Sequence, residues 1–230
     1  MSEAQGDLQP VLLTYPLEGS FRARNSPARR VPSHGTHLMG TTFAIDLIPV
    51  DARGRAARWS WRAALATEPP EGFIGFGATV FAPATGTVVV AHDGEADHEA
   101  RRSQFSLVAY MAGQAARAQR GVGAIAGNHV VVALDDGGPF VLVAHLRNGS
   151  QLVEVGERVK AGQPIAQCGN SGNSTQPHVH VQVTDSIDWS RARGLPLAFE
   201  TTDGAQLPAE SHIVVVPRSG PAQARGDRLP

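Results

Sequence analysis

Short apolar runs, separated by glycine and proline, dominate the chain from residue 31 onward. Many of these runs are rich in β-branched residues and are long enough for one strand each. We expect strands within Pro10–Tyr15, Phe43–Val50, Gly72–Val80, Ala84–His92, His129–Leu134, Phe140–His145, Gln151–Gly169, Val179–Thr184 and Ile213–Val216. Residues 187–199, which include Trp189, have the character of a loop. The pattern predicts a β-rich protein.

The segment from Asp97 to Arg120 has a different character, because it consists of good helix formers with apolar residues near i, i+3 and i+4 spacing. Glu99 lies early in this segment and Arg120 lies at its end, which suits the helix dipole. We therefore expect one helix inserted into the β domain. Residues 53–65 are basic and fit either a loop or a short helix.

A chain of 230 residues suits one elaborated domain with a sizeable core. We expect an irregular N-terminal extension at 1–30, a single β domain at 31–216 with the helical insertion at about 97–120, and a flexible tail at 217–230. The number of strands favours a mainly β fold, an antiparallel sandwich or open barrel, with one inserted α-helix.

Composition excludes several classes of protein. Twenty basic and twenty-one acidic residues give a net charge of −1 without a basic stripe, which argues against nucleic-acid binding. The single cysteine, Cys168, excludes an intrachain disulfide and a cysteine-rich metal site, and we expect a buried thiol there. No apolar run approaches the ~18 residues of a membrane span. The first residues lack a basic secretory signal, so the sequence favours the cytoplasm, or a chain whose leader has been removed.

The sequence Pro-His-Val-His-Val-Gln-Val contains the most informative pair of histidines, His178 and His180. Alternate residues of a strand point to the same face, so both imidazoles enter the same space. Two histidines that converge in this way are a common half of a metal site. Two solvated surface histidines are the alternative interpretation.

Asp46 lies in an otherwise apolar strand, where a carboxylate is costly unless it is paired or binds a metal. His34 and His37 are both candidates for its partner. If a hairpin is centred on Gly40, His34 lies directly opposite Asp46 at a Cβ separation of ~5 Å, and His37 faces Phe43. This geometry favours His34, although a bulge would reverse the choice.

His145 ends a strongly apolar strand just before a polar turn, where it can meet His178 as an acid–base pair. A structural histidine is the alternative. Four other histidines have no comparable motif around them, and we interpret them as structural or surface residues: His92, His98, His129 and His212.

Three motifs together, SHGTH…FAIDL, LVAHLRNGS and VEVGERVKAGQPIAQCGNSGNSTQPHVHVQV, resemble those of the lysostaphin-type (LytM-like) zinc metallopeptidases. The resemblance implies a duplicated hybrid motif fold with one zinc ion per chain. By resemblance, the zinc ligands are His34, Asp46 and His180, and the catalytic residues are His145 and His178. In the common family motif the first histidine precedes the aspartate by four residues, whereas here the gap is twelve from His34 or nine from His37, as in a long-loop variant.

The family's usual substrate is the peptide part of peptidoglycan, so the resemblance implies a cell-wall endopeptidase of the cell envelope. Three protein ligands leave a fourth zinc position for water, which is the arrangement of a catalytic site. The chain has no HExxH glutamate, so His145 and His178 must do the acid–base work. Asn170 and Asn173, in a glycine-rich loop before HxH, are candidate substrate-binding residues, although ordinary turn chemistry explains the same composition. Asn25 is a candidate oxygen ligand that would block the fourth position.

Two other functions remain open at this stage. A catalytically inactive LytM-like module would bind or regulate without hydrolysis, although all five site positions are filled. A carrier domain of the biotinyl or lipoyl type would need a lysine at a hairpin tip, and Lys160 lies in a different turn context. A carrier phosphorylated on His178 or His180 would need no aspartate.

Overall fold

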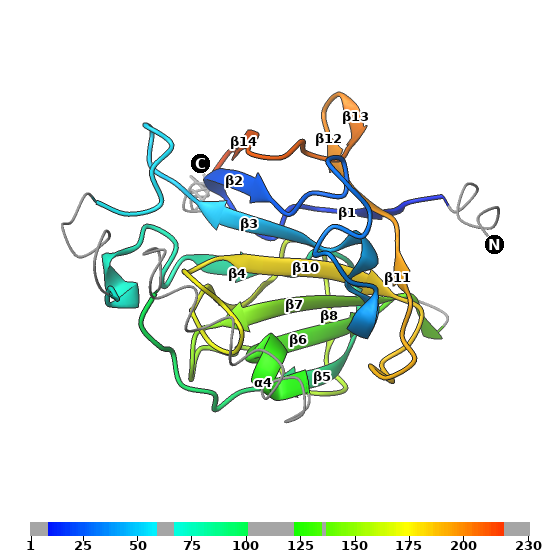
Figure 1. Ribbon diagram of the computed structural model, residues 1–230. Coiled ribbons are helices and arrows are strands. Elements are labelled where there is room, and N and C mark those ends of the chain that lie inside the picture. Colours follow the sequence, from blue (N-terminus) through cyan, green and yellow to red (C-terminus); the bar gives the residue numbers. More distant parts are fainter. Residues whose placement is uncertain (1–8, 59–66, 101–121, 135–136, 219–230) are drawn as a thin grey trace, which may run out of the picture.

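The computed structural model describes residues 9–58, 67–100, 122–134 and 137–218, and these residues form three β-sheets (Figure 1). The large sheet has the order β14 (Ile213–Val216), β2 (Gly19–Arg24), β3 (Ile45–Pro49), β10 (Val179–Thr184), β7 (Phe140–Leu146), β6 (Asn128–Ala133), β5 (Gly86–His92) and β8 (Arg158–Val159), with β11 (Gly194–Leu195) paired to β10. The two small sheets are β1 (Val11–Leu13), β12 (Leu197–Thr201) and β13 (Gly204–Gln206), and β4 (Thr79–Phe81) with β9 (Pro164–Gln167).

Described strand pairs are antiparallel except β1 with β12, which are parallel. The described strands of the large sheet end in two free edges, at β14 and β8, so they do not close into a barrel. The predicted class, a mainly β antiparallel fold, is confirmed.

The main core lies between the large sheet and the two small sheets. Alternate residues of β10, namely Val179, Val181 and Val183, point into this core together with Phe199 of β12 and Ile165 of β9. The β-branched content of these strands suits a pleated surface that is buried on one face. The other residues of β10 point to the opposite face of the sheet, where the site lies.

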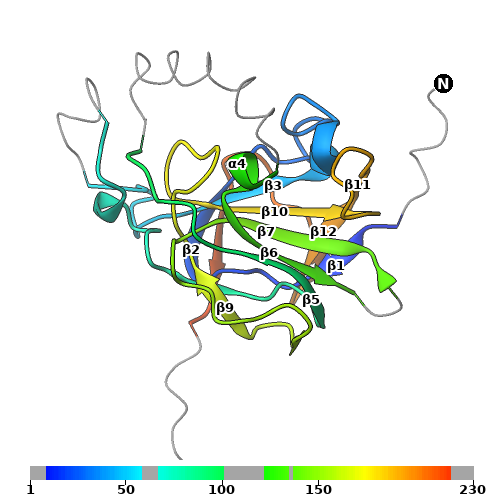
Figure 2. The same ribbon diagram turned by 90° about the horizontal axis from the view of Figure 1, so that it is seen from below.

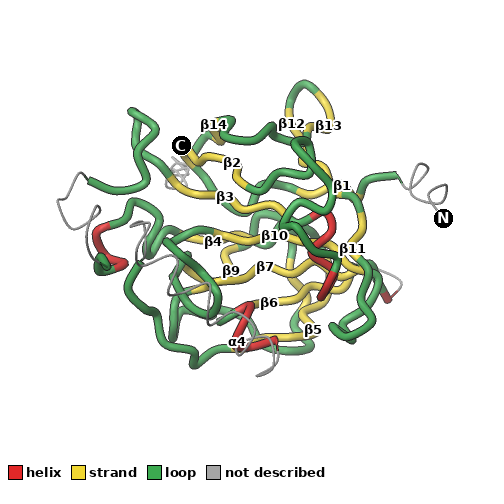
Figure 3. The backbone as a smooth tube through the Cα atoms, in the orientation of Figure 1, coloured by secondary structure: helices red, strands yellow, loops and turns green. Residues whose placement is uncertain are grey.

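Three short helical segments lie among the described residues (Figure 3): η1 (Leu38–Phe43), η2 (Pro70–Gly72) and α4 (Val122–Ala126). Figure 2 shows α4 and η1 on one side of the large sheet, with β1 and β9 on the other. η1 packs against β10 and β11, and α4 packs against β6. These two elements therefore flank the face opposite the main core. No helix among the described residues has the length and apolarity that a membrane span requires.

The N-terminal residues differ from the expected irregular extension, because residues 9–30 contribute two strands. β1 falls within the run Pro10–Tyr15, as predicted, while β2 was not predicted and pairs with β3 inside the large sheet. In the sequence Gly-Ser-Phe-Arg-Ala-Arg of β2, Phe21 and Ala23 point into the core and the arginines between and after them point outward. This segment is too short for its alternation of apolar and polar residues to indicate a strand. The other domain boundaries remain predictions.

Several other expectations change at the level of elements. Residues 187–199 were expected to form a loop, yet they contain β11 and the start of β12. The strand expected over Gly72–Val80 is formed only at its end, in β4. Of the predicted helix at 97–120, residues 97–100 are not helical and Ala100 bridges to Glu68, while 101–120 lie outside the described residues. The predicted tail at 217–230 falls mostly outside them as well.

Candidate metal centre

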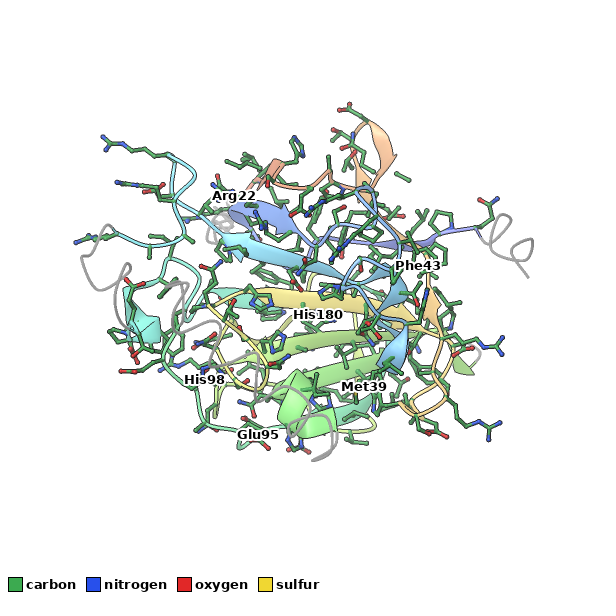
Figure 4. All side chains as sticks on the ribbon, in the orientation of Figure 1. Arg22, Met39, Phe43, Glu95, His98 and His180 are labelled. Carbon is green, nitrogen blue, oxygen red and sulfur yellow. The ribbon has the colours of Figure 1, made fainter. Side chains whose placement is uncertain are left out.

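Asp46 lies at the centre of a cluster of three histidines on the face of the sheet opposite the core. Asp46 on β3 pairs directly with His180 on β10, so their side chains share one face. His180 Nδ1 lies 2.9 Å from Asp46 Oδ1, and His34 Nε2 lies 3.2 Å from the same oxygen. His178 Nε2 is 3.6 Å from Asp46 Oδ1. Figure 4 shows His180 near the middle of this face.

The chemistry of these atoms fits a zinc ion. One ligand atom from each of His34, Asp46 and His180 lies within 4.8 Å of the others, which makes this the one such cluster found among the described residues. Two imidazole nitrogens and a carboxylate oxygen are ligands that zinc accepts in catalytic sites, where a fourth position stays open. These residues therefore suit a single zinc ion.

His34 reaches Asp46 through η1 and not through the hairpin that the sequence suggested. The chain turns in η1, a short 3-10 segment in which Met39 and Gly40 have φ of 56° and 74°. His34 precedes this turn in the chain. Ser33 Oγ donates to Thr41 O (3.2 Å) and lies 3.0 Å from His34 Nδ1. The Ser33 hydroxyl donates its only proton to Thr41 O, so it accepts a hydrogen bond from His34 Nδ1–H. The lone pair of His34 then lies on Nε2, which faces Asp46.

His37, the alternative first ligand, lies elsewhere. His37 is exposed, and its Nδ1 lies 3.1 Å from Thr42 Oγ1. The structure therefore brings His34, and not His37, to Asp46, although the reason differs from the hairpin geometry that led to the same choice.

A β-bulge directs His145 into the site. Strands β6 and β7 shift register between Asn128 and Val130, so that β7 has one extra residue before Leu146. His145 at this point has φ of 62°, a backbone conformation that is uncommon for residues with a side chain. Ala144 pairs with His180, and strict alternation would turn the next residue toward the core. The bulge instead places the His145 ring 4.7 Å from that of His178, between centroids.

Both predicted catalytic histidines have their Nδ1 held by a backbone carbonyl. His145 Nδ1 donates to Ser171 O (2.9 Å), and His178 Nδ1 donates to Gln176 O (2.8 Å). A neutral imidazole that donates from Nδ1 carries its lone pair on Nε2. His145 Nε2 is therefore available to accept a proton, while His178 Nε2 faces Asp46 Oδ1 at 3.6 Å.

Burial and neighbouring charge act in opposite directions on these groups. Burial alone would raise the pKa of Asp46, but the adjacent His34 and His178 hold it well below its usual value. Burial, together with repulsion from His178 and His180, lowers the pKa of His145 well below its usual value. Burial also tends to lower the pKa of His178, but attraction to Asp46 outweighs it and the pKa is raised. The two catalytic candidates thus differ in proton affinity.

Asn25 contacts the same carboxylate. Its Nδ2 donates to Asp46 Oδ2 at 2.7 Å, and its backbone is in the left-handed region with φ of 49°. The N-terminal residues therefore reach the site, as the sequence suggested. The amide nitrogen makes this contact, so a role of Asn25 as an oxygen ligand stays a prediction.

The two predicted substrate-binding asparagines differ in exposure. Asn170 is 0% exposed and its Nδ2 donates to His98 O (2.7 Å). This contact supports the loop, and a role of Asn170 in substrate binding stays a prediction. Asn173 is half-buried and its backbone N–H donates to Ile125 O (2.8 Å). Its role in substrate binding stays a prediction.

Sequence reasoning missed two residues that hold this loop. Asp97 accepts the backbone N–H of Asn170 at Oδ1 (2.6 Å) and that of Asn148 at Oδ2 (3.0 Å). His98 Nε2 donates to Gly172 O (2.9 Å). These contacts fix the segment whose Ser171 carbonyl orients His145. Nothing in the local pattern indicated them, because Asp97 and His98 lie about seventy residues from the loop and were assigned to a helix.

Comparison with known protein families gives a match over part of the chain. Residues 97–190 match the sequence model of peptidase family M23, a range that includes His145, His178 and His180 but not His34 or Asp46. The resemblance to lysostaphin-type peptidases is thereby confirmed.

Solved structures of similar proteins include several peptidases. The catalytic domain of lysostaphin from Staphylococcus simulans shares 24% identity, with 56% of this chain and 82% of that chain covered and a TM-score of 0.34. The antimicrobial peptidase lysostaphin from the same organism shares 22% identity over 62% and 49%, with a TM-score of 0.35. A zinc-containing peptidase from Vibrio cholerae shares 19% identity over 66% and 45%, with a TM-score of 0.33. This chain thus spans about half the length of the latter two.

Proposed function

We propose that this chain, which carries a region of peptidase family M23 at residues 97–190, is a zinc-dependent endopeptidase that cleaves peptide bonds in peptidoglycan cross-links or stem peptides. One observation carries the proposal. His34, Asp46 and His180 present ligand atoms within 4.8 Å of one another, and His145 and His178 adjoin them. A metal site of three ligands beside two imidazoles, each oriented by a hydrogen bond from Nδ1, is an arrangement for hydrolysis.

His34 Nε2, Asp46 and His180 Nδ1 would hold the zinc ion. When bound, zinc supplies a Lewis acid that polarises a peptide carbonyl and lowers the pKa of an attacking water. The protein's own contribution is to hold the two catalytic imidazoles at a fixed separation, 4.7 Å between ring centroids, each with Nδ1–H bound to a carbonyl.

The two histidines would divide the proton transfers. Burial lowers the pKa of His145, which stays neutral and would accept the proton of the attacking water at Nε2. His178, whose Nδ1–H is held by Gln176 O, would donate from Nε2 to the leaving amine and to the developing oxyanion.

The experiment is to measure zinc per chain and then to digest purified peptidoglycan. We expect about one zinc per chain and the release of free amino groups from the cell-wall peptide. His34→Ala, Asp46→Ala and His180→Ala should each lose the metal and the activity, whereas His37→Ala is the matched control and should keep both. No zinc uptake on titration would overturn the proposal.

An inactive module that binds or regulates other hydrolases is the second candidate. The presence of all five side chains, and the orientation of both catalytic candidates toward the ligands, supports an enzyme instead. Stoichiometric zinc with no release of amino groups from peptidoglycan or from its stem peptides would favour the inactive module.

A further inference from the structure

Gln182 connects one of the proposed zinc ligands to the turn that carries another. It is the second residue after His180 on β10 and points to the same face, where it is 3% exposed. Gln182 Oε1 lies 3.0 Å from His180 Nε2, and Gln182 Nε2 lies 2.9 Å from Met39 O in η1. Figure 4 labels both His180 and Met39, which lie on this side of the sheet.

These two contacts determine where the proton of His180 lies. The carbonyl of Met39 only accepts hydrogen bonds, so the amide NH₂ of Gln182 must face it. Gln182 Oε1 then faces His180 Nε2 and can only accept. His180 must therefore carry its proton on Nε2, and in the neutral ring the lone pair lies on Nδ1.

The lone pair on Nδ1 is directed at Asp46. Both His180 Nδ1 and Asp46 Oδ1 are then acceptors, 2.9 Å apart, an arrangement that suits a shared cation and resists a neutral hydrogen bond. If the acceptor on the other side of the ring were absent, the proton could move to Nδ1 and satisfy Asp46 directly. Zinc would then have to displace this proton before it could bind.

The other end of Gln182 is tied to the part of the chain that carries His34. Met39 O belongs to the same short turn as Thr41 O, which orients Ser33 and through it His34. The carbonyl groups of one turn thus determine the orientation of both histidine ligands. Among the described residues, Gln182 is the side chain that forms hydrogen bonds with both His180 and this turn.

We propose that Gln182 is a positioning residue that holds His180 as the Nε2–H tautomer and thereby raises the affinity of the site for zinc. This rests on the zinc function proposed above. Removal of a partner that orients a metal-binding histidine typically costs about 10- to 100-fold in metal affinity. A glutamine that merely fills buried space would leave the tautomer unchanged when it is replaced by an apolar side chain of similar length.

The test compares Gln182→Met, Gln182→Glu and the wild type in the full chain. Methionine has a similar length but offers His180 no oxygen acceptor, whereas glutamate keeps the acceptor and loses the donor to Met39 O. Thr184→Val is the matched control, because Thr184 is buried on the same face of β10 and donates to Ser186 O. Long-range ¹H–¹⁵N histidine spectra of the metal-free proteins report the tautomer, and competition with a chromogenic chelator reports zinc affinity.

We expect wild type, Gln182→Glu and Thr184→Val to retain a proton on His180 Nε2. Gln182→Met should move this proton to Nδ1 and weaken zinc binding by about 10- to 100-fold. An unchanged tautomer in Gln182→Met, or an unchanged zinc affinity, would overturn the proposal. If Gln182→Met does not fold, Gln182→Glu decides, because loss of the Nε2 proton in that variant also contradicts the proposal.

The same measurements separate this inference from the proposed function. Failure of the wild type to bind zinc would overturn the zinc peptidase, while the tautomer in the metal-free protein would still be read directly. Zinc bound by the wild type, with no effect of Gln182→Met, would overturn only the role of Gln182.

Discussion

Each histidine of the site has one ring nitrogen held by the protein and the other directed toward Asp46 or its neighbours. Ser33 Oγ holds His34, a backbone carbonyl holds His145, and another holds His178. Fixed tautomers cost the site no rearrangement when a metal or a substrate arrives, which is the benefit of an orienting partner. The roles of individual residues can therefore be tested one at a time.

Replacement of His178 by alanine should separate chemistry from metal binding. His178 is a proposed proton donor and not a proposed ligand, so His178→Ala should retain about one zinc per chain. Hydrolysis of peptidoglycan should fall by about 10²- to 10⁴-fold, the usual contribution of a positioned acid or base. Zinc analysis and a free-amine assay on the same sample give both values. Wild-type activity in this variant would remove the residue from the mechanism.

His129 should make stability depend on pH, away from the site. It is 4% exposed and donates from Nδ1 to Gly127 O (2.7 Å), and burial lowers its pKa below the usual 6.5. The unfolded chain then binds more protons than the folded one as pH falls through about 6.5, so the free energy of unfolding decreases with falling pH and levels off below the lowered pKa. His145 acts in the same direction.

His129→Asn should therefore flatten this dependence in part, because asparagine can keep the donor to Gly127 O without titrating. Urea unfolding between pH 8 and pH 5 measures the slope for the variant and the wild type. At pH 8 both side chains are neutral, so a difference there reports packing alone. Equal slopes would contradict the assignment.

At the scale of elements, the loop before HxH and the turn η1 position the site from opposite sides. The loop supplies Ser171 O to His145, and the turn supplies carbonyl groups to the residues that orient His34 and His180. Both are irregular segments attached to a rigid sheet, which is where functional residues commonly lie. Their anchors are therefore expected to affect function without contacting a ligand.

Asp97→Asn should loosen the loop. The carboxylate of Asp97 accepts hydrogen bonds from two backbone N–H groups, and in the variant one of these N–H groups would face the side-chain NH₂, which cannot accept. We therefore expect a loss of about 1 to 2 kcal/mol in unfolding free energy. Peptidase activity should fall while zinc content stays the same, because the loop orients His145 and not a ligand. Asp93→Asn is the control, since Asp93 accepts from Gly94 N and Gly149 N and does not contact the loop. Equal activity in the two variants would contradict this role.

Gly40→Ala should disturb the turn. Gly40 has φ of 74°, and an added Cβ would overlap Thr184 Cγ2. The strain of a left-handed alanine is about 1 kcal/mol or more, and the overlap adds to it by displacing the turn that orients His34. We expect weaker zinc binding together with lower stability. Gly35→Ala has a similar φ of 78° but an open environment, so it should lose stability without an equal loss of zinc affinity.

At the scale of the whole molecule, the three proposed ligands come from separate parts of the chain that only the fold brings together. His34 precedes η1, Asp46 is on β3 and His180 is on β10. An unfolded chain has no such site, so zinc should stabilise the folded state by mass action.

Zinc at about a thousandfold excess over its dissociation constant should add about 4 kcal/mol to the unfolding free energy. For a domain of this size that corresponds to roughly 10 °C in melting temperature. Calorimetry in EDTA and in buffered zinc measures the difference. His34→Ala should remove this difference and His37→Ala should retain it, and an equal response of the two variants would contradict the ligand assignment.

Much of this protein could be predicted from the sequence, because strand periodicity is a local property. The two-residue spacing placed His178 and His180 on one face, and the apolar run around Asp46 marked a carboxylate that needed a partner. Most strands of the large sheet follow from runs of β-branched residues. The order of motifs indicated the peptidase family.

Only the tertiary structure decided how the remaining residues meet. Alternation along β7 would turn His145 into the core, and a bulge against β6 reverses that direction. Asp97 reaches the loop that orients His145 from a segment interpreted as a helix. Bulges, turns and long-range hydrogen bonds depend on partners distant in the chain, so no local period encodes them.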